Sequence, residues 1–87
     1  METQQFLLTG GSRGIWGSEV NLVREAGHDV VFMGRDEVLI GRVAQEAGAC
    51  GIRADVSVGD DNSRTVEVCR ERMGGIDVLV NNVAFGY

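Results

Sequence analysis

The sequence contains no proline and no lysine. Because lysine is absent, the eight positively charged side chains are all arginines. Thirteen acidic residues outnumber them and give a net charge of −5 and a pI near 4.6. A surface of this sign repels phosphate backbones and anionic lipids. The composition therefore argues against nucleic acid or a membrane surface as the main partner.

Long apolar runs are also absent. No stretch approaches the ~20 apolar residues that span a membrane, and the N-terminus lacks the charged and apolar regions of a secretory signal, so we expect a cytoplasmic protein. The 87 residues suffice for one small domain. Because a domain of this length hides only about 60–65% of the surface of its unfolded chain, we expect help from a second copy.

Metal-binding residue types are few and far apart. Cys50 and Cys69 are separated by eighteen residues, and His28 is the single histidine. This spacing does not form a zinc-binding set, so no metal site is expected. Both cysteines are interpreted as small core residues, with a disulfide as the disfavoured alternative in a reducing compartment. His28 is interpreted as a solvated turn residue.

Short apolar runs alternate strictly with stretches of helical periodicity. The strands are expected at residues 5–9, 28–34, 51–56 and 76–81. The helices are expected at residues 14–26 and 35–47, followed by a third that starts at Asp60 and stops at Gly74-Gly75. The third helix would pack through Val66, Cys69 and Met73. Strict alternation demands right-handed crossovers and therefore a parallel sheet, with expected strand order 3-2-1-4.

A glycine-rich loop connects the first strand to the first helix. Residues Thr9 to Gly17 read T-G-G-S-R-G-I-W-G. Loops of this kind let backbone N–H groups approach a diphosphate, which the helix N-terminus then holds. The loop predicts a nucleotide site, although Trp16 stands where the pattern T-G-x-x-x-G-x-G has its third glycine.

These motifs together resemble the short-chain dehydrogenases/reductases. Thr9 to Ile15 is similar to the glycine loop of that family, Gly34-Arg35-Asp36 to the end of its second strand, and Ile76 to Asn82 to its fourth strand and the turn after it. The resemblance spans residues 1–87 and corresponds to about the first third of such an enzyme. It implies an α/β fold, a Rossmann-like βαβαβαβ half-domain whose four-stranded parallel sheet binds NAD(P).

The resemblance also implies which residues bind the cofactor. They are Gly10, Ser12, Arg13, Gly14, Ile15, Arg35, Asp55, Val56 and Asn82. Arg35 stands where members that prefer NAD usually have an acidic residue, so Arg13 and Arg35 favour NADP(H) through its 2′-phosphate. Asp55 and Val56 would contact the adenine. The alternatives are that both arginines are solvated surface residues and that Asp55 caps the turn before the third helix.

Three departures from the family pattern leave the strength of cofactor binding open. Trp16 either occludes the cofactor groove or covers exposed core, and Val83-Ala84 replace the family's Ala-Gly after Asn82. Residual binding of NADP(H) is expected, and weak or lost binding is the alternative that these departures leave open. The alternative function is a non-enzymatic interaction protein that keeps the fold without the cofactor.

The catalytic residues that the family uses have no counterpart in this chain. The family uses a serine and a Tyr-x-x-x-Lys pair, but no lysine is present and the single tyrosine, Tyr87, is the last residue. We assign no catalytic residue. Because the fourth strand would expose an apolar sheet edge, we expect a homo-oligomer that forms through this edge.

Overall fold

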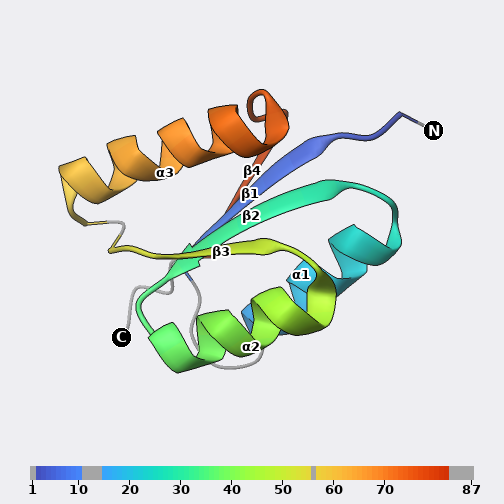
Figure 1. The fold of residues 1–87 in the computed structure, drawn as a ribbon, viewed down its shortest axis with the longest axis horizontal. Coiled ribbons are helices and arrows are strands. Elements are labelled where there is room, and N and C mark those ends of the chain that lie inside the picture. The colour runs from blue at the N-terminus through green and yellow to red at the C-terminus, as the bar shows by residue number, and fades with distance from the viewer. Residues whose placement is uncertain (1, 11–14, 56, 83–87) are drawn as a thin grey trace.

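The computed structural model describes residues 2–10, 15–55 and 57–82. In chain order the elements are β1 (Gln5–Gly10), α1 (Ile15–Glu25), β2 (Asp29–Gly34), α2 (Glu37–Ala47), β3 (Cys50–Arg53), α3 (Gly59–Met73) and β4 (Val78–Asn82). The strands form one parallel four-stranded sheet of order β3-β2-β1-β4. Helices α1 and α2 lie on one face of it and α3 on the other (Figure 1). The predicted fold class and strand order are confirmed.

The two central strands are buried on both faces. On the α1/α2 face the core consists of Leu8, Val20, Val30, Phe32, Ile40 and Val43. On the α3 face a smaller cluster forms from Leu7, Val31 and Cys69. Because neighbouring residues of a strand point to opposite faces, β1 contributes Leu7 to one cluster and Leu8 to the other. This double burial explains the continuous apolar runs of the sequence.

Helix α2 begins two residues later than predicted, at Glu37 rather than Arg35. The Asp36 carboxylate accepts hydrogen bonds from the backbone N–H groups of Val38 and Leu39, both at 3.1 Å. Asp36 is therefore the N-cap and satisfies two of the N–H groups that a helix start leaves unpaired. At the other end Gly48 adopts the left-handed conformation, at φ 65°, that ends helices and favours glycine.

The inner face of α3 differs from the prediction by one residue. Thr65 is only 1% exposed, whereas Val66, which was predicted to face inward, is 45% exposed. Thr65 tolerates burial because its hydroxyl donates to the Asp61 carbonyl at 2.8 Å. Cys69 is buried as predicted, and Met73 packs against the same cluster.

The ends of the last two strands also differ from the prediction. The third strand stops at Arg53 rather than residue 56, because Asp55 forms a turn in which its carbonyl accepts from Val58 N at 2.9 Å. The fourth strand starts at Val78 rather than residue 76. In the described part of the chain, no helix is long and apolar enough to cross a membrane.

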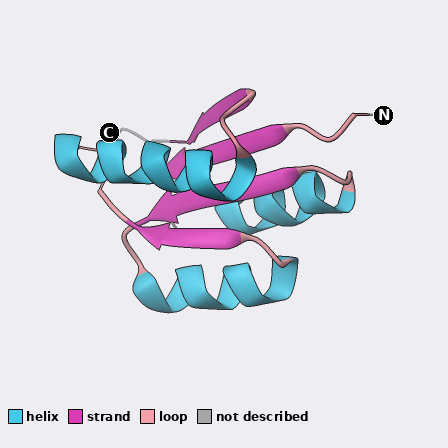
Figure 2. Cartoon of the chain, turned by 45° about the horizontal axis from the view of Figure 1, so that its top comes forward, coloured by secondary structure: helices cyan, strands magenta, loops and turns pink. Residues whose placement is uncertain are grey.

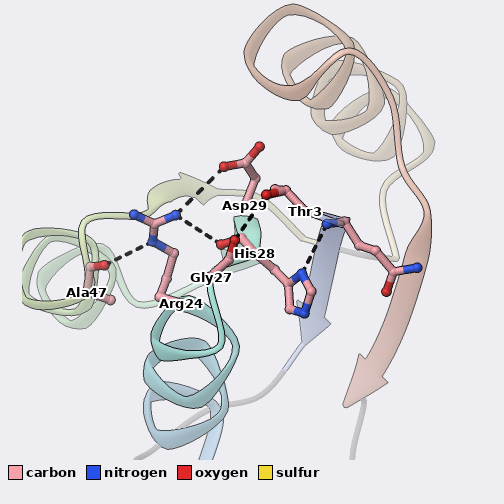
Figure 3. Close-up of polar contacts among 7 residues, drawn as sticks. Thr3, Arg24, Gly27, His28, Asp29 and Ala47 are labelled. Atoms are coloured by element: carbon pink, nitrogen blue, oxygen red, sulfur yellow. Dashed lines mark hydrogen bonds and ion pairs between the residues drawn. The ribbon is translucent and has the colours of Figure 1, made fainter. Parts of the chain in front are cut away.

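Polar contacts join the helix ends at the amino edge of the sheet (Figure 3). The Arg24 guanidinium donates to the carbonyls of Ala47 at 3.3 Å and His28 at 2.9 Å, and lies 3.7 Å from the Asp29 carboxylate. His28 is half-buried, and its Nδ1 accepts the Gln4 N–H at 3.0 Å. The interpretation of His28 as a solvated turn residue left out this contact, through which the ring holds the segment before β1.

Gly51 generates a prediction about stability. A Cβ atom there would lie 2.5 Å from Ile40 Cγ2 and 2.7 Å from Phe32 Cζ, inside the α1/α2 core. Gly51→Ala should therefore lower the free energy of unfolding by about 1–3 kcal/mol, as overpacking commonly does. Urea denaturation measures the loss. Gly41→Ala on α2 is the control, because nothing lies within 4 Å of its Cβ position; equal stability in both variants would contradict the close packing around Gly51.

Candidate functional site

The carboxyl ends of the four strands meet along one edge of the sheet. Gly10 at the end of β1 is in register with Asn82 of β4, and Gly34 of β2 with Arg53 of β3. The Ala54 N–H donates to the Gly34 carbonyl at 2.8 Å, which continues the β2–β3 pairing past the strand ends. The structure thus places Gly10 beside Asn82, and brings the segments with Arg35 and Asp55 together on the same edge.

Several predicted site residues lie outside the described part of the chain. They are Ser12, Arg13, Gly14 and Val56, together with Val83 and Ala84 of the segment after β4. Ile15 and Trp16 are the first two residues of α1, and Asn82 ends β4, but the description does not extend to these three side chains. The site is therefore built from Gly10, Arg35 and Asp55.

Asp55 is held in a tight turn between β3 and α3. Its Oδ1 accepts two hydrogen bonds from Ser57, one from the backbone N–H at 2.9 Å and one from the hydroxyl at 2.7 Å. These bonds stabilise the charged form and lower the pKa of Asp55 below 3.8, and the nearby positive charge of Arg35 lowers it further. The carboxylate is therefore ionised at neutral pH.

Two partners of Asp55 were missed by the sequence analysis. Ser57 is one, and the other is Asp61, whose carboxylate accepts the Asp55 N–H at 2.8 Å. A signal for Ser57 was available in the sequence. An Asp side chain often accepts the backbone N–H of the residue two positions later and so closes a turn, and Ser57 stands at that position after Asp55. These contacts give structural weight to the alternative that Asp55 caps the turn before α3.

Arg35 is exposed and follows directly on the last residue of β2. The pairing of Gly34 with Arg53 and the hydrogen bond from Ala54 N–H to the Gly34 carbonyl bring the segments of Arg35 and Asp55 to one region of the edge. A guanidinium exposed to solvent can still bind a phosphate with two parallel hydrogen bonds.

The first turn of α1 differs from those of the other helices. It contains no acidic residue, whereas α2 has Glu37 and α3 has Asp60 and Asp61. The partial positive charge of a helix N-terminus is therefore offset by carboxylates in α2 and α3 and not in α1. Since α1 follows the glycine loop, this helix end suits an anionic group.

Among residues 2–10, 15–55 and 57–82, no three His, Cys, Asp or Glu side chains gather as they would to hold a metal ion. Cys50 and Cys69 are both free thiols. Burial raises the pKa of Cys69 to about 11, so this thiol stays protonated and behaves as a core residue.

The Asp55 turn generates a prediction about pH. Ser57→Ala removes the hydroxyl donor but keeps the backbone donor, so the pKa of Asp55 should rise toward 3.8. The stability contributed by this carboxylate is present above pH 3.8 and declines as the pH falls through its lowered pKa. Carboxyl NMR titration measures the shift, with Ser63→Ala on α3 as control. An unchanged Asp55 titration in Ser57→Ala would contradict the described turn.

Comparison with known proteins extends these observations. The family model for short chain dehydrogenases matches residues 4–86. Zerumbone synthase of Zingiber zerumbet is 36% identical over 86 residues, which cover 94% of this chain and 32% of that protein. The A-factor type gamma-butyrolactone 1'-reductase (1S-forming) of Streptomyces virginiae is 39% identical over 85 residues, covering 92% of this chain and 33% of that protein.

A solved structure gives the same result. The 3-ketoacyl-(acyl-carrier-protein) reductase from Brucella melitensis, complexed with NADH, superposes with a TM-score of 0.83 at 30% identity, covering 90% of this chain and 33% of that one. The chain thus spans about a third of the length of the relatives that it matches. With its sheet order, its glycine loop and this match over residues 4–86, the chain belongs to the short-chain dehydrogenase family.

Proposed function

We propose that this chain is an NADP(H)-binding module equivalent to the N-terminal part of a short-chain dehydrogenase/reductase. The observation that carries the proposal is the placement of Arg35. It is exposed at the carboxyl end of β2, beside the ionised Asp55 and on the same edge as Gly10. Ligands of open α/β sheets bind outside the carboxyl ends of the strands.

Each part of the cofactor has a proposed partner. The loop of Gly10, Ser12, Arg13, Gly14 and Ile15, with the acid-free start of α1, would hold the diphosphate. Arg13 and Arg35 would hold the 2′-phosphate, Asp55 and Val56 the adenine, and Asn82 the ribose and nicotinamide side. When bound, the nicotinamide supplies hydride transfer.

The preference for NADP(H) rests on the arginines of this chain. The Brucella melitensis structure is a complex with NADH, so the comparison supports a nicotinamide cofactor without favouring the phosphorylated form. An acidic residue after β2 would accept hydrogen bonds from the ribose hydroxyls of NAD, and its negative charge would repel a 2′-phosphate. Arg35 reverses that charge, which supports NADP(H).

A second candidate is a non-enzymatic interaction protein that has lost the cofactor. Trp16 favours it, because this large residue is the second of α1, where the family pattern has the glycine that permits close packing of helix and strand. Val83 and Ala84 favour it as well, since each adds a methyl group relative to the family's Ala-Gly.

Catalysis by the 87 residues alone is not part of the proposal, since no residue of this chain matches the catalytic Tyr-x-x-x-Lys pair. We propose that a longer protein containing this segment would reduce a carbonyl or oxidise an alcohol, as members of the family do. The proposal includes a cytoplasmic location and homo-oligomer formation, both of which stay predictions.

Calorimetric titration with NADPH and NADH tests the cofactor proposal. NADPH should bind more tightly, and Arg35→Asp should erase the difference, at a cost to NADPH binding of about 1–3 kcal/mol for one charged hydrogen-bonding partner. Arg42→Asp is the matched control, because it makes the same charge change at an exposed position of α2. An equal loss of NADPH affinity in both variants would show that the change in net charge, and not a contact of Arg35 with the 2′-phosphate, causes the loss.

The same titration separates the two candidates. Absence of heat with either dinucleotide at millimolar concentration would reject the cofactor module. Trp16→Gly then identifies the cause: restored NADPH binding shows that Trp16 occludes the groove. If the wild-type chain binds NADPH and Trp16→Gly weakens that binding, Trp16 is itself a cofactor contact.

A further inference from the structure

A pocket of about 350 Å³ lies at the amino edge of the sheet, where β2 and β3 begin. The four strands run in the same direction (Figure 2), so this edge lies opposite the carboxyl edge of the candidate cofactor site. The end of α1, the starts of β2 and β3 and the end of α3 contribute the lining. The volume is at the low end of the range for small-molecule sites, so the pocket suits a small ligand.

Positive charge exceeds negative charge in this pocket. In the described part of the chain, the charged side chains that line it are Arg24, Arg72 and Asp29, which are two guanidiniums and one carboxylate. The whole chain, by contrast, has a net charge of −5. A local excess of positive charge in a concave site attracts small anions.

Arg24 is fixed in position and still has free donors. Its Nε and Nη1 donate to the carbonyls of Ala47 and His28, and Nη1 lies 3.7 Å from the Asp29 carboxylate (Figure 3). These carbonyls lie at or just beyond the ends of α2 and α1, where partial negative charge would otherwise repel an anion. Nη2 makes no hydrogen bond with the described residues, and it lies 3.8 Å from the position of a Cβ on Gly48, which also lines the pocket. Its two N–H groups are therefore available to a ligand.

Arg72 has no partner among the described residues. It is exposed in the last turn of α3, where Arg70 pairs with Glu67 at 3.6 Å. The dipole of α3 favours a cation in this turn, and Arg70 meets that preference as well as Arg72 does. Arg72 differs from Arg70 because it also lines the pocket. Its guanidinium can bind a carboxylate with two parallel hydrogen bonds.

The two guanidiniums approach the pocket from different sides. Arg24 comes from α1 and Arg72 from α3, and these helices lie on opposite faces of the sheet (Figure 1). A single compact anion fits one guanidinium, whereas a molecule with an anionic group at each end fits both. Apart from the charged groups the lining is apolar and includes Val30, Ala49 and Met73. Such a lining suits a short hydrocarbon chain between the two anionic groups.

We propose that this pocket binds a small aliphatic dicarboxylate, with one carboxylate on Arg24 and the other on Arg72. The pocket shares no residue with the candidate cofactor site. Its test is run without dinucleotide, so either proposal can fail while the other holds.

The thiol of Cys50 reports whether the pocket is occupied. Cys50 is half-buried and lines the pocket, whereas Cys69 is fully buried. Iodoacetamide should therefore alkylate Cys50 first, which mass spectrometry detects. The probes are succinate, glutarate and adipate, which differ in chain length. The tightest-binding of them should slow the alkylation by about tenfold at ten times its dissociation constant, and acetate at equal ionic strength should not. Absence of protection by all three dicarboxylates would overturn the proposal.

Calorimetric titration of variants tests the role of the arginines. Arg72→Gln should weaken binding of the same dicarboxylate by at least about fivefold, because one charged hydrogen-bonding partner is lost. Arg70→Gln is the matched control, since it removes the same charge from the same turn of α3 outside the pocket. Both positions are exposed, so both variants should fold. Equal weakening in the two variants would contradict the assignment of Arg72. Inorganic phosphate that binds as tightly as the dicarboxylate would contradict the two-carboxylate ligand.

Discussion

Strand β1 lies between two parallel neighbours, β2 and β4, and is covered by helices on both faces. Its backbone groups must therefore be paired on both sides, and its buried side chains are mostly apolar on both faces. Parallel neighbours also require crossover helices, which run back over the sheet. The helices α1, α2 and α3 are these crossovers, and the carboxyl ends of all four strands consequently meet at one edge.

The order of elements was predictable from the sequence because it follows from this constraint. The apolar run Val30 to Met33 has no polar alternation, which is typical of a strand buried on both faces. The details that were predicted wrongly depend on local hydrogen bonds. Thr65 replaces Val66 on the inner face of α3 because its hydroxyl finds an acceptor within the helix. The third strand stops early because Ser57 closes the turn at Asp55.

For the candidate site, too, some features follow from the order of the strands and others depend on local contacts. Its location follows from topology: any parallel sheet of this order brings the residues after β1, β2, β3 and β4 to a common edge. The state of its side chains does not follow from topology. The lowered pKa of Asp55 depends on two hydrogen bonds from a residue that is two positions away, and on an arginine that follows another strand. Periodicity describes burial and contains no information about such contacts.

The contact between His28 and Gln4 has a consequence for the chemistry of the ring. Because Nδ1 accepts a backbone N–H, the neutral imidazole must carry its proton on Nε2. The chain has a single histidine, so the nitrogen spectrum of one ring identifies its tautomer without ambiguity. The Nδ1 resonance of this ring therefore reports on the hydrogen bond that holds the segment before β1 to the loop after α1.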